Sequence, residues 1–319
     1  MSEASPSGGP PAGKTRWIRQ FRGAKNPVDP WKPYAFFVED EYGAAADPPS
    51  YAILLITNRE CPFTCLMCDL WKNTLDEEVP EGAIVHQMRH ALGSLPPVEG
   101  LKLYNAGSFF DPRAIPPGEL EGIAAICRNY RRTVVECHPA FINDSCFRFH
   151  DAIGGTLEVA IGLETVHPQV LPRLNKEMTL ESIEKKVRCL HREGIRTRAF
   201  ILLKPPGLDE AEGIHWALET LRFAQDRGIS TSVLIPTRGG NGAMEKLAEE
   251  GLFASPALES LECVLACALE ERKGRIFADT WDLEAFPACP QCRPHRIRNI
   301  EEMNLTQEPS PPTRCPHPR

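Results

Sequence analysis

The sequence has no apolar run approaching eighteen residues, which a helix needs to cross a membrane. Its first fourteen residues, MSEASPSGGPPAGK, lack the apolar core of a secretory signal. It also lacks a positive net charge, because 43 acidic residues against 36 basic ones leave −7. We therefore expect a cytoplasmic protein without a membrane partner, and one that does not coat nucleic acid with its whole surface.

Twelve cysteines in a reducing compartment favour metal ligands or buried apolar positions over disulfides. Cys61, Cys65 and Cys68 fall within eight positions, in the stretch NRECPFTCLMCDLWKN, and the next cysteine is Cys127. A structural zinc site commonly takes four ligands in two close pairs. Three thiolates suit a [4Fe-4S] cluster better, because they bind three irons and leave the fourth open to another ligand. A zinc site or a redox-active dithiol is the alternative.

Six short apolar or β-branched runs predict strands, and helical stretches separate them. Within the fourth run, Leu157, Val159, Ile161 and Leu163 alternate with charged or small residues, so one face is apolar and the other polar. This pattern favours an α/β fold, a partial (β/α)6 TIM-type barrel with a polar lumen, over a doubly wound sheet or a closed eight-stranded barrel. The six runs are residues 52–57, 100–105, 133–138, 157–164, 196–204 and 229–236.

Composition divides the chain into three parts. Proline and glycine crowd residues 1–50, which we expect to form a disordered or extended arm. Its segment from Lys14 to Lys25 holds five basic residues and no acidic one, and is either a solvated arm or a short helix that meets RNA. The barrel is expected at 51–273. Residues 274–319 form a Pro-rich, Cys-containing tail, which is too short for its own core and would rely on a metal or on docking.

The tail is a second candidate metal site. Cys289 and Cys292 form a CxxC pair, and Cys315 and His317 could complete a set of four ligands. This set has the ligand types of zinc, although not its standard spacing. A second iron–sulfur cluster or unliganded cysteines are the alternatives.

The CxxxCxxC spacing after an apolar strand resembles that of the radical S-adenosylmethionine (SAM) superfamily. The resemblance implies a partial barrel whose [4Fe-4S] cluster binds SAM at the open iron. It also implies reduction by an external flavodoxin- or ferredoxin-type donor, and cleavage of SAM to a 5′-deoxyadenosyl radical that abstracts hydrogen from a substrate. Met67 differs from the superfamily, which usually has an aromatic residue there.

The same resemblance assigns cofactor contacts to the ends of later strands. The stretch YNAGSFFD matches the glycine-rich segment that meets the SAM amino group, and AIGLET ends in an acid that meets its ribose or amino group. VECHPAFI resembles an Elongator-like stretch, with His138 and Ala140 in place of an arginine and a second acid. The implied contacts are Asn105, Gly107, Ser108, Glu136, Glu164 and, for the SAM carboxylate, Arg198.

Beyond the superfamily, NRECPFTCLMCDLWKN, AGSFFD, IGLET, LLKPPGLDEAE and CPQC…NLTQEPS…C resemble the archaeosine-biosynthesis radical SAM family in order and separation. That resemblance implies a tRNA-modifying enzyme, which cleaves a carbon–nitrogen bond of a lysine-conjugated 7-deazaguanine. A related deazapurine or a different small molecule is an alternative substrate. An alternative of another class is a non-catalytic, metal-stapled adaptor that binds RNA.

Overall fold

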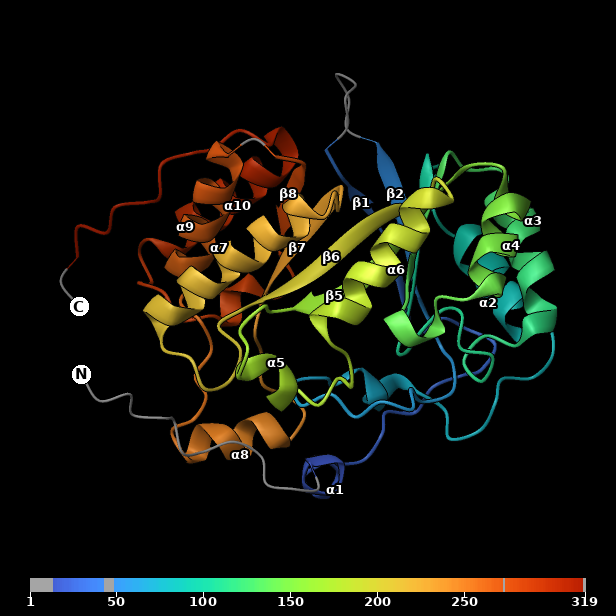
Figure 1. Ribbon diagram of the computed structural model, residues 1–319, viewed down its shortest axis with the longest axis horizontal. Coiled ribbons are helices and arrows are strands. Elements are labelled where there is room, and N and C mark those ends of the chain that lie inside the picture. Colours follow the sequence, from blue (N-terminus) through green and yellow to red (C-terminus); the bar gives the residue numbers. More distant parts are fainter. Residues whose placement is uncertain (1–13, 43–48, 272, 318–319) are drawn as a thin grey trace.

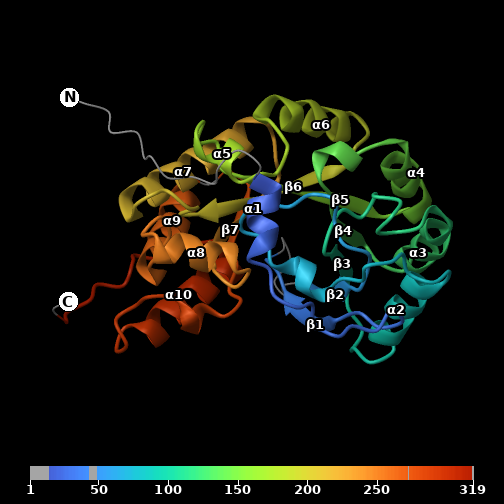
Figure 2. The same cartoon turned by 90° about the horizontal axis from the view of Figure 1, so that it is seen from below.

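The protein is described by a computed structural model at residues 14–42, 49–271 and 273–317. Residues 1–13, the first part of the expected arm, lie outside this description. An eight-stranded sheet forms the centre, with its strands side by side in sequence order. The sheet curves into an open half-barrel with helices around its outside (Figure 2). Among the described residues, no helix combines the length and apolar character that a membrane span requires.

Six parallel strands correspond to the six predicted runs, and the predicted partial barrel is confirmed. Helices follow them in turn, as parallel pairing requires a crossover. The strands are β2 (Ser50–Ile56), β3 (Gly100–Asn105), β4 (Arg132–Glu136), β5 (Thr156–Glu164), β6 (Arg196–Leu203) and β7 (Thr231–Pro236).

Two edge strands extend the sheet beyond the six. β1 (Ala35–Asp40) pairs antiparallel with β2, and β8 (Arg275–Ala278) pairs parallel with β7. The sheet therefore crosses both boundaries drawn from composition, at residues 50 and 273. Both strands are short and adjoin Pro-rich or polar segments, and such strands depend on pairing and packing with their neighbours.

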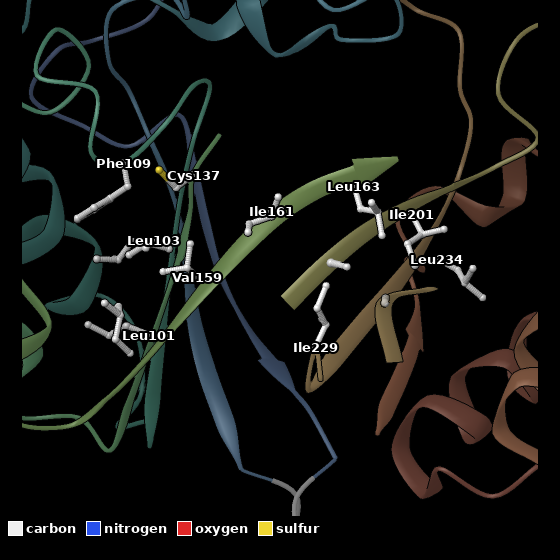
Figure 3. Packing of buried hydrophobic residues seen from close by; sticks show 14 of the residues in the cluster. Leu101, Leu103, Phe109, Cys137, Val159, Ile161, Leu163, Ile201, Ile229 and Leu234 are labelled. Carbon is white, nitrogen blue, oxygen red and sulfur yellow. The ribbon is translucent and has the colours of Figure 1, made fainter. Parts of the chain in front are cut away.

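The main core lies between the sheet and the outer helices. Leu101, Leu103, Val159, Ile161 and Ile201 point from the strands toward the helix layer (Figure 3), and all are buried. The alternation predicted for the fourth run is thus confirmed. The helices around the outside are α2 (Ala83–Leu92), α3 (Leu120–Cys127), α4 (Asp144–Ile153), α6 (Leu180–Arg192), α7 (Glu210–Asp226) and α9 (Leu258–Glu270).

Three shorter helices gather at the end of the half-barrel where the parallel strands terminate (Figure 1). They are α1 (Lys14–Gln20), α5 (Val170–Arg173) and α8 (Ala243–Glu249). In a βα barrel this is the end that carries the functional site. The loops also contain 3-10 helices, η1 (Leu70–Asn73), η2 (Pro117–Glu119), η3 (Pro139–Phe141) and η4 (Leu283–Ala285).

The tail covers the open edge of β8 through its helix α10 (Arg293–Thr306). The Asn304 side-chain amide accepts from the Ala278 N–H and donates to the Ala278 carbonyl, both at 2.8 Å. Gln307 does the same for Ile276, at 2.8 and 2.7 Å. The NLTQ stretch therefore supplies the hydrogen bonds that a ninth strand would make, and it protects the edge from other chains.

The lumen is closed at the amino ends of the strands by a buried ion-pair cluster. Arg198 bonds Glu158 at 2.6 Å and Glu41 at 2.8 Å, and Lys102 reaches Glu41 at 2.7 Å. Arg275 adds contacts to both acids. Although burial opposes the charge, Arg198 and Lys102 hold the pKa of Glu41 well below its usual range.

We predict that Arg198→Ala lowers the free energy of unfolding by about 3–5 kcal/mol, because it leaves buried carboxylates without their main partner. Urea unfolding of the metal-free protein measures this loss. The control is Arg188→Ala on α6, whose side chain is 66% exposed in its pair with Glu184, and its loss should stay below about 1 kcal/mol. Equal losses for the two variants would show that the buried cluster is not stabilising.

Candidate active site

The three-cysteine loop directly follows β2, at the end of the half-barrel where α1, α5 and α8 gather (Figure 1). All three cysteines are free thiols. Burial raises the pKa of Cys61 to about 11 and that of Cys68 to about 12, and raises that of Cys65 further. The thiols are therefore protonated at neutral pH, and a metal that binds them displaces their protons.

Two other loops hold the backbone of the cysteine loop in place. The Leu66 N–H donates to the Leu174 carbonyl at 2.9 Å, and the Asn175 side chain donates to the Thr64 carbonyl at 2.7 Å. From the glycine-rich loop after β7, Asn241 donates to the carbonyls of Leu66 and Cys68, at 2.6 and 3.2 Å. The position of the cysteines is thus set by residues more than a hundred positions away in sequence.

Helices α1 and α8 cover the cysteine loop with apolar side chains. Ile18 of α1 is 1% exposed and packs with Leu66 and with Met244 of α8. Gly242 has φ 86°, and a Cβ there would lie 1.9 Å from the Phe21 carbonyl oxygen, so only glycine lets the arm approach this closely. Met67, which replaces the usual aromatic residue, packs on the same apolar cluster.

Two basic residues of the arm are engaged with the segment around the cysteine loop. Arg22 pairs with Glu60 at 2.6 Å and lies over the Trp71 ring, while Lys25 bonds Glu60 at 2.8 Å and Asp76 at 2.7 Å. This part of the arm therefore covers the loop and is not a free solvated segment, while Arg16 and Arg19 of α1 are exposed.

A polar cradle without protein partners lies beside Cys61. Within the described part of the chain, both side-chain polar atoms of Asn105, which is 1% exposed, lack hydrogen bonds, as does Oδ1 of Asn58. A Cβ on Gly107 would lie 3.5–3.6 Å from Asn105, Asn58 and Cys61, so these residues adjoin one another. Buried polar atoms normally have partners. These donors and acceptors fit a ligand that carries both kinds of group, as the amino-acid part of SAM does.

Ser108 and His138 brace this region from within. The Ser108 hydroxyl accepts the His138 N–H at 3.0 Å. The His138 ring stacks on Phe63 of the cysteine loop, with ring centroids 4.0 Å apart, and contacts the Lys176 carbonyl at 2.9 Å. Burial lowers the pKa of His138 to about 4, so the ring is neutral. It cannot supply the positive charge of the arginine that it replaces.

Glu136 and Glu164 end adjacent strands and face Lys176. Lys176 pairs with Glu164, and it occupies the space over Gly162 in β5, where a Cβ would clash with its ammonium group. Although burial opposes it, Glu164 raises the pKa of Lys176 and keeps it charged. Burial raises the pKa of Glu136 to about 7, against the opposing charge of Lys176. Glu164 has φ 64°, a strained backbone of the kind found at functional sites.

The structure brings together five of the six proposed cofactor contacts, but Arg198 lies elsewhere. It is the third residue of β6, at the opposite end of the lumen, where its guanidinium forms ion pairs with Glu158 and Glu41. Sequence reasoning missed Asn58, Lys176 and Asn241. The glycine-rich context of Asn241 was a signal, whereas nothing in the sequence around Lys176 distinguishes it from a surface lysine.

Three cysteines of the tail form a separate group. The sulfurs of Cys289, Cys292 and Cys315 lie within 4.8 Å of one another. His317 does not join the group. Among the described residues the cysteines of the first loop do not form such a tight group. Wider spacing suits a cubane cluster, in which each thiolate binds a different iron.

The partial barrel and the three-cysteine loop beside a polar cradle agree with the predicted resemblance to the radical SAM superfamily, and a sequence relative confirms that resemblance. The chain is 27% identical over 213 residues to archaeosine synthase subunit beta of Thermococcus kodakarensis, covering 64% of this chain and 66% of that one. It is 24% identical over 300 residues to an uncharacterized protein of Methanocaldococcus jannaschii, covering 87% and 82%.

No family model matches the chain. Among solved structures, it resembles a queuine lyase from Clostridium spiroforme bound to SAM and queuine, with a TM-score of 0.48 and 16% identity. That match covers 69% of this chain and 88% of the other.

We predict that Glu136→Gln makes the metal-free protein more stable at pH 8 than the wild type, by about 1–3 kcal/mol. The folded pKa of about 7 exceeds the ordinary value of 4.5, so wild-type stability falls as pH rises between these values. Glutamine removes the cost of a buried charge, and the gain should vanish below about pH 4.5. Urea unfolding at several pH values measures it, with the exposed Glu301→Gln as control. A gain independent of pH would contradict the burial of a charged carboxylate.

Proposed function

We propose that this protein is a cytoplasmic radical SAM enzyme, in which Cys61, Cys65 and Cys68 hold a [4Fe-4S] cluster. The observation that carries the proposal is a set of three partly buried, free thiols on one braced loop, beside buried side-chain atoms of Asn105 and Asn58 that have no partner among the described residues. Held by these three thiolates and reduced by a flavodoxin- or ferredoxin-type donor, such a cluster would supply the electron for reductive cleavage of SAM.

The residues around the loop have distinct roles in this proposal. Asn105 and Asn58 bind the amino-acid part of SAM, and the missing side chain of Gly107 leaves room for it. Glu136 and Glu164 lie further along the strand ends, where they can meet the rest of the cofactor or the substrate. The apolar packing of α1 and α8 limits the access of water to the loop.

For the substrate, we propose a lysine-bearing 7-deazaguanine in tRNA, cleaved at a carbon–nitrogen bond. The similarity to archaeosine synthase subunit beta supports this assignment. The site supports it as well, because the carboxylate of Glu136 makes no hydrogen bond within the described part of the chain. A buried carboxylate of this kind suits an ammonium group or the N–H edge of a deazapurine.

The function is tested by anaerobic reconstitution with iron and sulfide. We expect a brown protein that bleaches with dithionite, converts SAM to 5′-deoxyadenosine and forms product from tRNA that carries the lysine-conjugated base. Cys65→Ala should abolish both reactions, whereas the control Cys189→Ala on α6 should leave them intact.

The outcomes separate the alternatives. Cleavage of SAM without product from this tRNA would overturn the proposed substrate and leave another small molecule. A colourless protein that contains only zinc would overturn the enzyme and favour the RNA-binding adaptor.

We also predict that Asn105→Ala weakens SAM binding by about 10-fold or more, because it removes two buried polar contacts. Equilibrium binding of SAM to the reconstituted protein measures the effect. The cluster absorbance should be unchanged, and the control Asn129→Ala alters an exposed asparagine at the end of α3. Unchanged SAM affinity in Asn105→Ala would remove this residue from the proposed site.

A further inference from the structure

The tail contains a thiol cluster that the proposed radical chemistry does not use. Cys289, Cys292 and Cys315 place their sulfurs within 4.8 Å of one another, and none of them forms a disulfide. Among the described residues, no other group of three or more possible metal ligands has its ligand atoms this close together. Cys292 is buried and the other two are partly exposed, so the cluster lies at the surface but is anchored from inside.

Local backbone structure positions the first two cysteines. The N–H groups of Cys292 and Arg293 donate to the Cys289 carbonyl at 3.1 and 2.9 Å, which makes a tight turn immediately before α10. In such a turn both side chains of a CxxC pair point to one side. The turn leads into the amino terminus of a fourteen-residue helix, whose dipole favours negatively charged thiolates.

The third cysteine reaches the pair because the tail folds back over α9 and α10. Glu262 of α9, which is fully buried, accepts from the Thr313 N–H at 3.0 Å and from its hydroxyl at 2.6 Å. It also binds Arg296 and Asn299 of α10. One buried carboxylate thus fixes both helices and the segment two residues before Cys315. Hydrogen bonds of the protein itself therefore hold Cys315 close to the other two cysteines.

We propose that Cys289, Cys292 and Cys315 form a site for one zinc ion. A zinc–sulfur bond of about 2.3 Å in a tetrahedral site separates neighbouring sulfurs by about 3.8 Å, which agrees with three sulfurs inside 4.8 Å. Thiolates select soft or borderline ions such as zinc over magnesium or calcium. A cubane cluster needs a wider set of thiolates, and a CxxC disulfide would leave Cys315 without a partner.

The zinc ion fastens the tail to the outside of the barrel. After α10, hydrogen bonds from Thr313 to Glu262 and from Asn299 to the Pro311 carbonyl tie the tail down. A metal that joins Cys315 to the start of α10 closes this segment into a loop and limits its unfolded conformations. The site is therefore structural, and it is independent of the cluster on the first loop.

Elemental analysis of the full-length protein, purified without added zinc and then reconstituted anaerobically, tests the proposal. We expect about one zinc per chain in addition to the iron. Cys315→Ser should lose zinc but keep iron, whereas Cys61→Ala/Cys65→Ala/Cys68→Ala should lose iron but keep zinc. Cys267→Ser on α9 is the matched control, and should keep both metals.

A second measurement keeps the test valid if Cys315→Ser unfolds the tail. Cobalt(II) added to zinc-free wild-type protein should produce the intense visible bands of tetrahedral cobalt bound to thiolates, and zinc should displace them. Folded protein with three free thiols and no zinc or cobalt binding would overturn the proposal. So would a Cys289–Cys292 disulfide in the isolated protein, or iron at these cysteines in the triple variant. Failure of SAM cleavage has no bearing on any of these results.

Discussion

The structure depends on how the main-chain carbonyls of one loop are held. The carbonyls of Thr64, Leu66 and Cys68 accept hydrogen bonds from Asn175 and Asn241, two side chains on distant loops. These bonds join the ends of β2, β5 and β7, so the cysteines keep their places although the barrel is open. A ligand set on a mobile loop would have to be ordered whenever a metal bound, at a cost in conformational entropy. Here the loop is already ordered when the barrel folds, so metal binding does not have to order it.

The two ends of the lumen differ in how their charges are satisfied. At the amino ends of the strands, Arg198 and its neighbours neutralise one another and close the barrel. At the carboxyl ends, Asn105 keeps two buried polar atoms without partners, and the pKa of Glu136 is raised by burial. The amino ends of the strands therefore hold charges that neutralise one another, whereas the carboxyl ends hold polar groups without such partners among the described residues.

The edge strands of the open sheet come from two segments whose sequences predict little regular structure. The arm supplies α1 over the cysteine loop and then β1, and the tail supplies β8 and the amide side chains that cover it. An incomplete barrel exposes two strand edges, and unpaired edges invite association with other chains. The arm and the tail are therefore structural parts of the barrel, and the proposed zinc site would hold the second of them in place.

The sequence by itself determined the class of fold and singled out the three-cysteine loop, because strand alternation and the CxxxCxxC spacing are local patterns. It also identified Asn105, Glu136 and Glu164, since each ends a recognisable strand. It could not assign the partners of Arg198. Strand alternation predicts which face a side chain occupies, but not which charged residues of other strands lie next to it. Only the tertiary structure decided that Lys176 and Asn241 meet the cysteine loop and that three tail cysteines converge. Those contacts join residues far apart in the chain, and their geometry arises only when the half-barrel has folded.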